Sequence, residues 1–228
     1  MTVQRELVER ATPGLHSVVF ERLTGLRPPP LKVLDLGAGT GAWADRLLAA
    51  GYEVTALEQS NGGYSGSSPV VFADLNGGFV SQLNGQTFDV VTCIEVIEHV
   101  ENPRELLRGA RSLLSPGGII IVTTPNFEST AGRLRFLWTG ELRHFGRDPQ
   151  FNDPTHISPI HTLMFMRALD AADLVLVEHW YDQLRATGSR WPFRLIARVL
   201  DPFLRGARGG NNHIYIIAPV GITNQEKS

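Results

Sequence analysis

Short apolar runs alternate with longer stretches of helical periodicity along most of this 228-residue chain. The apolar runs have the length of strands and are mostly continuous rather than alternating, which is typical of a parallel sheet covered on both faces. The pattern therefore predicts an α/β fold with helices on both sides of one sheet. The runs expected to be strands are 32–36, 53–57, 70–74, 88–94, 118–124, 174–181 and 213–219.

The helical stretches have clear boundary signals. Asn102 is a candidate N-cap, followed by Pro103 at the first helical position and by Glu105 at the spacing of a capping box. Ser158 and Pro159 suggest the same arrangement for a later helix. The helices expected from these signals are 3–26, interrupted near Pro13-Gly14, then 41–51, 103–114 and 158–174.

These elements predict an N-terminal helical segment (1–30), one domain (31–219) and a disordered tail (220–228). Two segments, 125–157 and 182–211, exceed what a minimal α/β unit needs. Long connections in compact domains are usually functional or disordered. The first of these insertions follows the end of a strand, where open parallel sheets bind ligands.

Composition limits the function classes. The chain is 43% hydrophobic and 19% charged with a net charge of −2, which suits a soluble globular protein and provides no overall field that attracts nucleic acid. Its single cysteine, Cys93, excludes an internal disulfide and fits a reducing compartment. The N-terminus lacks the apolar run of a signal peptide, and no stretch approaches the ~18 apolar residues of a membrane span. These features predict a cytoplasmic location.

Three glycines, Gly37, Gly39 and Gly41, separate the first strand from the next helix in "VLDLGAGTGAW". Such glycines let the backbone turn tightly and let a ligand approach it closely. Glu58, at the end of the second strand, can accept two hydrogen bonds from a ribose diol.

Three interpretations of this loop are open. It can be a plain tight turn, or a dinucleotide fingerprint, because Ala42 completes a G-x-G-x-x-A spacing. It can also bind a cofactor that contains adenosine without phosphate. Asp35 lies just before the glycines, where its charge disfavours a pyrophosphate and suits a cationic amine.

Five segments in order, "VLDLGAGTG", "ALEQS", "FADLN", "FDVVTCIEVIEHV" and "LLSPGGIIIVTTPN", resemble the motifs of class I S-adenosylmethionine-dependent methyltransferases. The resemblance is close over residues 30–126 and looser to 219. It implies a Rossmann-like, seven-stranded, mostly parallel sheet, in which the last strand is antiparallel and lies between the fifth and sixth. It also implies S-adenosylmethionine as the cofactor.

The same resemblance implies a role for each motif residue. The methionine end of the cofactor would lie beside Asp35 and the glycine loop, the ribose beside Glu58, and the adenine beside Asp74 and Leu75. An alternative for Asp74 is a turn-forming role before "LNGG". The full set expected to bind the cofactor is Asp35, Gly37, Ala38, Gly39, Gly41, Glu58, Gln59, Asp74, Leu75 and Cys93.

Charged residues follow the fourth strand in "EVIEHV". If 95–100 forms a helical turn, Glu95, Glu98 and His99 share one face. Methyl transfer to a hydroxyl needs a base or a metal ion that lowers the hydroxyl pKa. Two carboxylates and an imidazole suit Mg²⁺, Mn²⁺ or Zn²⁺, with the hard ligands favouring the first two. Alternatively, Glu95 pairs with Arg104 or Arg108, and His99 is a general base without metal.

"EVIEHV" resembles a motif of ubiquinone-biosynthesis O-methyltransferases and of small-RNA terminal 2′-O-methyltransferases. In those families both glutamates and the histidine bind a divalent cation together with a later histidine. His156 is the expected fourth ligand here, with His144 and His161 as further candidates.

The first insertion mixes aromatic residues with arginines. The aromatic residues can pack a helix against the sheet while the arginines face water, or the segment can recognise an anionic or sugar-bearing acceptor. The arginines are Arg133, Arg135, Arg143 and Arg147. A basic amphipathic stretch within the second insertion, 189–208, can contact the inner face of an anionic membrane that carries a lipid-linked acceptor, or cover a sheet edge or dimer contact.

The sequence thus predicts an S-adenosylmethionine-dependent O-methyltransferase for a small phenol, quinol or sugar-type acceptor, assisted by Mg²⁺ or Mn²⁺. One alternative is terminal 2′-O-methylation of RNA, against which the near-neutral charge counts. Another is a non-catalytic cofactor-binding module, which the intact Glu95, Glu98 and His99 disfavour. A dehydrogenase is disfavoured by Asp35 and by the motifs after the fourth strand.

Overall fold

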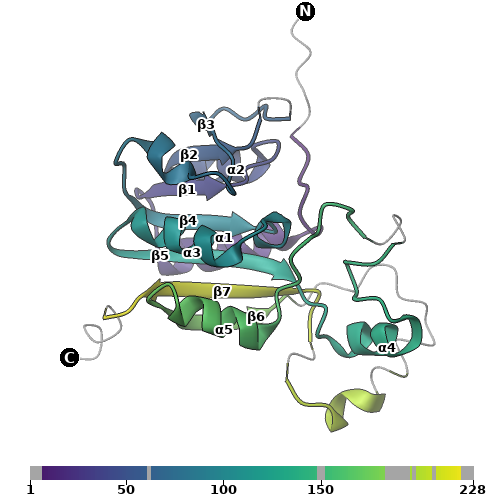
Figure 1. The fold of residues 1–228 in the computed structure, drawn as a ribbon. Coiled ribbons are helices and arrows are strands. Elements are labelled where there is room, and N and C mark those ends of the chain that lie inside the picture. Colours follow the sequence, from purple (N-terminus) through teal and green to yellow (C-terminus); the bar gives the residue numbers. More distant parts are fainter. Residues whose placement is uncertain are drawn as a thin grey trace, which may run out of the picture.

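The computed structural model describes residues 7–60, 63–147, 152–182, 196, 199–206 and 209–221. Seven strands form one sheet in the order β3-β2-β1-β4-β5-β7-β6 (Figure 1). Strands β1 to β5 pair in parallel, whereas β7 is antiparallel to both β5 and β6. The predicted fold class is therefore confirmed, including the inserted antiparallel last strand. The bounds are β1 Lys32–Leu36, β2 Glu53–Glu58, β3 Val70–Phe72, β4 Phe88–Ile94, β5 Leu114–Pro125, β6 Leu174–Tyr181 and β7 Asn212–Pro219.

Helices cover both faces of the sheet. On one face lie α1 (Leu15–Leu26) and α2 (Ala42–Ala49), and on the other α3 (Pro103–Ser112), α5 (Thr162–Asp170) and the 3₁₀ turn η1 (Phe79–Leu83). Side chains of the central strands are fully buried between these layers, and each such aliphatic residue contributes about 1.5–3 kcal/mol. This burial on both faces explains the continuous apolar runs of the strands.

Helix boundaries differ from those expected at two places. Helix α1 begins only after Gly14, whose φ of 88° interrupts the chain, so the expected helix is wrong over residues 7–14; residues 1–6 lie outside the described part. Helix α5 is capped by His161, which accepts a hydrogen bond from the Leu163 N–H, rather than by Ser158. The Ser158 hydroxyl instead donates to the Val100 carbonyl oxygen at 2.6 Å.

The predicted cap of α3 is present. The Asn102 side chain accepts a hydrogen bond from the Glu105 N–H at 3.3 Å, and Pro103 is the first helical residue. This cap begins α3 at Pro103, so residues 95–101, between β4 and the cap, are available for other contacts.

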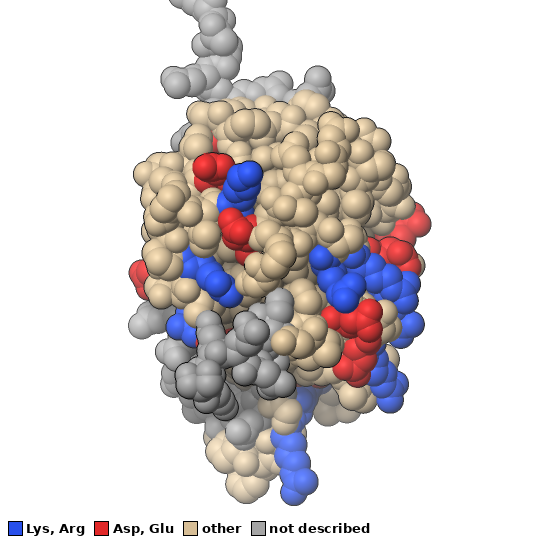
Figure 2. Space-filling model, turned by 90° about the vertical axis from the view of Figure 1, so that its left-hand side faces the viewer, with Lys and Arg blue, Asp and Glu red and all other residues tan. Residues whose placement is uncertain are grey.

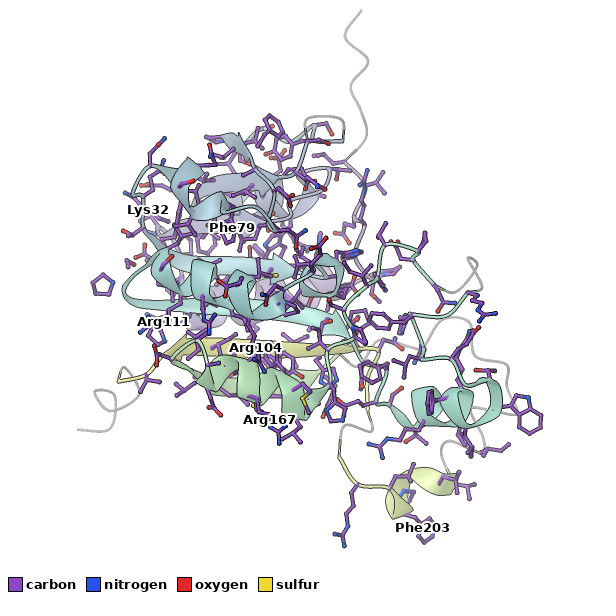
Figure 3. All side chains as sticks on the ribbon, in the orientation of Figure 1. Lys32, Phe79, Arg104, Arg111, Arg167 and Phe203 are labelled. Carbon is purple, nitrogen blue, oxygen red and sulfur yellow. The ribbon has the colours of Figure 1, made fainter. Side chains whose placement is uncertain are left out.

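The first insertion contains a helix that the apolar pattern did not reveal, α4 (Thr130–Thr139), which projects beyond the carboxyl ends of the parallel strands (Figure 1). Its apolar residues face solvent: Leu137 and Trp138 are 83% and 81% exposed. Most of 189–208 lies outside the described residues, and its proposed membrane contact stays a prediction. Within it, the 3₁₀ turn η3 (Asp201–Phe203) ends in Phe203, which points outward (Figure 3). The predicted disordered tail also falls outside the described part beyond residue 221.

The amino and carboxyl ends of the parallel strands differ in what surrounds them. At the amino ends of the parallel strands, basic and acidic side chains are interspersed over a surface without a large field of one sign (Figure 2). The carboxyl ends face the N-terminal segment and the first insertion (Figure 1). No helix in the described part of the chain is long and apolar enough to span a membrane.

Candidate active site

A pocket of about 1500 Å³ lies at the carboxyl ends of β1, β2 and β4. Its walls come from the glycine loop, residues 8–13, the segment after β4, and the first insertion. Pockets for a single drug-sized ligand usually have volumes of roughly 300–1,000 Å³. This pocket therefore has room for a cofactor and a second molecule.

Asp35, near the end of β1, is a buried residue of the pocket wall. Its Oδ1 accepts a hydrogen bond from the Thr92 hydroxyl at 3.0 Å, and that hydroxyl accepts one from the Trp43 indole at 3.1 Å. Its Oδ2 is buried and has no hydrogen-bond partner among the described residues. Burial raises the pKa of Asp35 to about 7, with a further contribution from the nearby charge of Glu58. A cationic ligand group would restore the ionised form.

Hydrogen bonds link the glycine loop, which follows Asp35, to the end of β2, where Glu58 lies. The N–H groups of Gly37 and Ala38 donate to the Leu57 carbonyl at 2.8 and 3.0 Å, and the Gly39 N–H donates to Glu58 Oε2 at 2.6 Å. These bonds fix the carboxylate at the pocket wall. They leave its second oxygen for a diol, as expected for a ribose-binding residue.

The three glycines are needed for different reasons. A Cβ on Gly37 would lie 2.6 Å from a Val96 methyl carbon, and one on Gly41 would lie 2.7 Å from the Gly66 Cα. At Gly39, by contrast, the nearest atom is the Arg10 Cδ at 3.7 Å. All three residues have positive φ. Gly41 therefore packs closely against Gly66, while Gly37 and Gly39 line the pocket.

Three of the remaining residues expected to bind the cofactor line the pocket, and one does not. Gln59, Asp74 and Leu75 line the pocket. Asp74 also forms the turn considered as its alternative role, because its Oδ1 accepts a hydrogen bond from the Asn76 N–H at 2.9 Å. Cys93 lies in the core instead, 2% exposed, and its neighbour Ile94 lines the pocket.

A second group of polar residues meets beside the cofactor region. Candidate ligand atoms of Glu98, His99 and His156 lie within 4.8 Å of one another. The 3₁₀ turn η2 (Ile97–His99) carries the first two. The Glu98 carbonyl accepts hydrogen bonds from the N–H groups of Ile157 and Ser158, at 3.0 and 2.9 Å, which hold His156 against η2.

The carboxylate of Glu98 is fully buried; within the described chain only the Thr124 hydroxyl and the backbone N–H of Glu98 are near enough to donate to it, and neither forms a hydrogen bond of normal geometry. Burial, followed by the charge of Glu95, raises the pKa of Glu98 well above the usual range. An isolated buried carboxylate is costly unless a cation or donor accompanies it. The site is therefore chemically suited to a positive charge.

Both histidines present an unprotonated nitrogen. His156 Nδ1 lies 2.9 Å from the His144 carbonyl oxygen and must donate to it. His99 Nδ1 lies 2.9 Å from the hydroxyl of Thr155, which itself donates to Asp153, so this nitrogen donates as well. The inferred tautomers leave both Nε2 lone pairs free. Burial and the neighbouring His156 lower the pKa of His99 and favour this neutral form.

Glu95 lies outside this group. Its carboxylate accepts hydrogen bonds from the N–H and hydroxyl of Thr12, at 2.5 and 2.9 Å. Glu95 has a φ of 52°, which is not a right-handed helical value, and the 3₁₀ turn η2 begins only at Ile97. The expected helical turn with Glu95, Glu98 and His99 on one face is therefore wrong. The alternative ion pairs are absent from the described residues: Arg108 pairs with Glu105, and Arg104 lies on the solvent side of α3 (Figure 3). Burial raises the pKa of Glu95, opposed by its bonds to Thr12.

Of the three candidate later histidines, only His156 joins the cluster. His161 caps α5, and its Nε2 lies 3.2 Å from Glu128 Oε1. His144 contributes its carbonyl oxygen to His156 from an unusual backbone conformation, with φ 71°. Burial, reinforced by the charge of Arg143, lowers the pKa of the His144 side chain to about 3.

The sequence profile of a family described as a methyltransferase domain matches residues 9–179. The chain belongs to this methyltransferase-domain family. The match spans the glycine loop, "EVIEHV" and the first insertion, and it confirms the resemblance stated for the sequence. S-adenosylmethionine is the cofactor that this membership implies.

Curated relatives of this methyltransferase include ubiquinone biosynthesis O-methyltransferases. The protein of Serratia proteamaculans is 33% identical over 138 residues, 54% of each chain, and that of Rickettsia canadensis is 36% identical over 102 residues, 42% of this chain and 43% of the relative. The chain thus matches about half the length or less of these relatives. The protein of Xanthomonas axonopodis pv. citri is 26% identical over 83% of this chain and 84% of its own.

Solved structures share the fold of this methyltransferase at low identity. An S-adenosylmethionine-dependent methyltransferase from Archaeoglobus fulgidus has a TM-score of 0.62 and 21% identity, over 89% of this chain and 93% of its own. The CcbJ methyltransferase from Streptomyces caelestis has a TM-score of 0.63 and 17% identity, over 95% and 94%. These likenesses show the common architecture.

Some pocket residues of this methyltransferase escaped the sequence reasoning. Thr12 and Arg10 come from a segment expected to be helical, and no local pattern links them to the pocket. Thr155 could have been found: the Asp153-Pro154 pair is a turn signal, and the Thr155 N–H bonds to Asp153 Oδ1 at 2.8 Å.

Proposed function

We propose that this methyltransferase transfers the methyl group of S-adenosylmethionine to a hydroxyl of a small phenol, quinol or sugar-type acceptor, assisted by Mg²⁺ or Mn²⁺, of which two imidazole ligands favour Mn²⁺. The observation that carries the proposal is that candidate ligand atoms of the buried Glu98 carboxylate and of the His99 and His156 imidazoles lie within 4.8 Å of one another. Relatives named O-methyltransferases support oxygen as the methyl acceptor.

The cofactor would be held by charges already placed in the pocket. Asp35 Oδ2 would receive the α-ammonium group, and Glu58 would receive the ribose hydroxyls through the oxygen that Gly39 leaves unused. Asp74 and Leu75 would border the adenine. When bound, S-adenosylmethionine supplies an activated methyl group that needs in-line positioning more than covalent help from the protein.

The cluster would govern the proton of the acceptor. One carboxylate and two imidazoles form a mixed ligand set that fits a divalent cation, and such a cation lowers the pKa of a hydroxyl bound to it. Hydrogen bonds to the His144 carbonyl and to Thr155 hold the two imidazoles with Nε2 available. Burial keeps His99 neutral, so in the absence of the cation its free nitrogen would be available to accept the hydroxyl proton; a nitrogen that binds the cation has no lone pair left for this role.

Glu95 has a positioning role in this proposal. Its bonds to Thr12 draw residues 8–13 over the pocket, where the Val8 carbonyl accepts a hydrogen bond from the Thr40 hydroxyl at 2.8 Å. The N-terminal segment would thereby shield the cofactor from water.

Methyl transfer from labelled S-adenosylmethionine to a panel of catechols, quinols and sugars tests the proposal, with a short RNA as a further acceptor. We expect transfer to a small hydroxylated acceptor that EDTA abolishes and Mn²⁺ restores. The Glu98→Gln variant should bind S-adenosylhomocysteine normally, but its methyl transfer should stay low whether EDTA or Mn²⁺ is added. Full activity of Glu98→Gln in EDTA would refute the metal. Cofactor binding without transfer to any acceptor would identify a non-catalytic module.

A further inference from the structure

Two arginines of the first insertion line the pocket, as does the largely exposed Trp138, whereas Phe136 and Leu137 face solvent. Arg135, from α4, and Arg143, just after it, both line the pocket. Leu137 is 83% exposed, and Phe136 is 52% exposed. This is the reverse of the arrangement in which aromatic residues pack a helix against the sheet and arginines face water. An inward guanidinium requires a reason that packing does not supply.

The charge of Arg143 is incompletely compensated. Its one hydrogen bond within the described chain is to a neutral acceptor, the Asn211 side-chain oxygen at 3.1 Å. The charge of Asp182 acts favourably on the guanidinium, but the two groups form no ion pair within 4.0 Å, and the Asp182 carboxylate accepts hydrogen bonds from the Asn211 N–H at 2.6 Å and the Asn212 side chain at 2.8 Å instead. Burial lowers the pKa of Arg143. A half-buried guanidinium in this position favours an anionic partner.

Arg135 has a hydrogen-bond donor without a partner in the described part of the chain. One terminal nitrogen lies 3.3 Å from Glu141 Oε2, an oxygen that also accepts a hydrogen bond from the Arg147 N–H. Its Nε is buried and has no hydrogen-bond partner among the residues described. Guanidinium donors are arranged to bind a planar carboxylate through two parallel bonds. Arg135 therefore has an ion pair with Glu141 and one further donor without a partner within the described chain.

These arginines lie close to the proposed reaction centre. His144 follows Arg143 in the chain, and its carbonyl oxygen orients His156 at 2.9 Å. The charges of both Arg143 and Arg135 act on the His144 side chain, so the three residues are near one another. A molecule bound at the arginines would reach His99 and His156, which line the same pocket.

We propose that Arg143 and Arg135 form a carboxylate-binding subsite, so that the acceptor of this methyltransferase is a hydroxylated carboxylic acid. The inference rests on the proposed function and narrows its substrate class. The guanidinium groups fix the acid end of the acceptor, which orients its hydroxyl toward the cluster and the methyl group. Charge in the pocket is thereby divided: acidic residues hold the cationic cofactor on one side, and basic residues hold the anionic acceptor on the other.

Binding to the complex with S-adenosylhomocysteine tests the subsite without depending on catalysis. Two matched pairs serve as probes: protocatechuate with its neutral amide, and glucuronate with glucose. In at least one pair, calorimetry should show the acid binding about tenfold or more tightly than the neutral partner. Arg143→Gln should abolish this preference, and Arg143→Lys should retain part of it. Arg147→Gln, a change at an almost fully exposed arginine of the same insertion, should leave it intact.

The variants need a control for folding, because Arg143 also bonds to Asn211. Normal binding of S-adenosylhomocysteine and an unchanged melting temperature provide it, and Arg135→Gln offers a second route should Arg143→Gln unfold. Equal binding of acid and neutral probe in both pairs overturns the subsite, as does a preference that survives in Arg143→Gln and Arg135→Gln. An arginine-dependent preference without methyl transfer to any probe supports the subsite and counts against the proposed O-methylation.

Discussion

The unpartnered oxygen of Asp35 predicts that cofactor affinity depends on pH. The pKa of this buried carboxyl is raised to about 7, and protonation removes the negative charge that would face the ligand's α-ammonium group. A proton and the ammonium group therefore compete for Asp35. Affinity should fall as pH decreases through 7, and S-adenosylhomocysteine, whose ammonium group stays protonated in this range, is the suitable ligand.

The magnitude follows from the fraction of ionised Asp35. That fraction is roughly one tenth at about pH 6 and nine tenths at about pH 8, so the dissociation constant should change about tenfold, or ~1.4 kcal/mol. Calorimetry at both pH values measures it. Asp35→Asn should bind weakly at either pH, with the slope removed. Asp74→Asn should weaken binding and keep the slope. A wild-type dissociation constant that is the same at both pH values would refute the assignment of Asp35.

The same residue affects folding with a definite sign. Because the folded pKa exceeds the unfolded value, the contribution of Asp35 to stability is full below about pH 4 and is lost as pH rises toward 7. Ligand-free protein should therefore gain stability near neutral pH when Asp35 is replaced by Asn, in spite of its weaker cofactor binding. Urea unfolding of both forms at several pH values measures this difference.

Three further predictions follow from the pocket. Thr12→Val should weaken S-adenosylhomocysteine binding about three- to tenfold, through loss of its hydroxyl bond to Glu95; unchanged affinity in calorimetry would argue against the N-terminal segment as a cover. Mn²⁺ at about a hundred times its dissociation constant should stabilise the wild type by about 2.7 kcal/mol in thermal unfolding but not Glu98→Gln; equal shifts would place the ion elsewhere. Gly41→Ala should destabilise by about 1–3 kcal/mol, because its Cβ would meet the Gly66 Cα at 2.7 Å; a change below about 0.5 kcal/mol in urea unfolding would contradict this contact.

The sheet and the cofactor half of the site could be predicted because their signals are local. Burial on both faces leaves continuous apolar runs, and a tight turn beside Val96 and Gly66 requires glycine at Gly37 and Gly41. Parallel strands then bring their carboxyl ends together, so Asp35 and Glu58 had to share one edge.

The acceptor half depends on such contacts, and the prediction was less accurate there. Glu95 and Glu98 have similar sequence surroundings, yet a contact with Thr12, 83 residues away, turns the first toward the N-terminal segment. The start of α5 depends on whether Ser158 or His161 caps it, and a bond to Val100 takes the serine hydroxyl. Helix α4 lacks a buried apolar face, so hydrophobic periodicity could not reveal it.

The backbone turn at His144 has a consequence for how such enzymes can diverge. This turn fixes an imidazole of the cluster with its carbonyl oxygen, and the preceding residue is the arginine that faces the acceptor. In the proposed function, the stretch that holds the two pocket arginines therefore also orients His156, whereas Glu98 and His99 come from the turn after β4. Exchanging residues 126–158 between related enzymes would then change acceptor preference and replace one member of the cluster, while the other two stay with the strands that bind the cofactor.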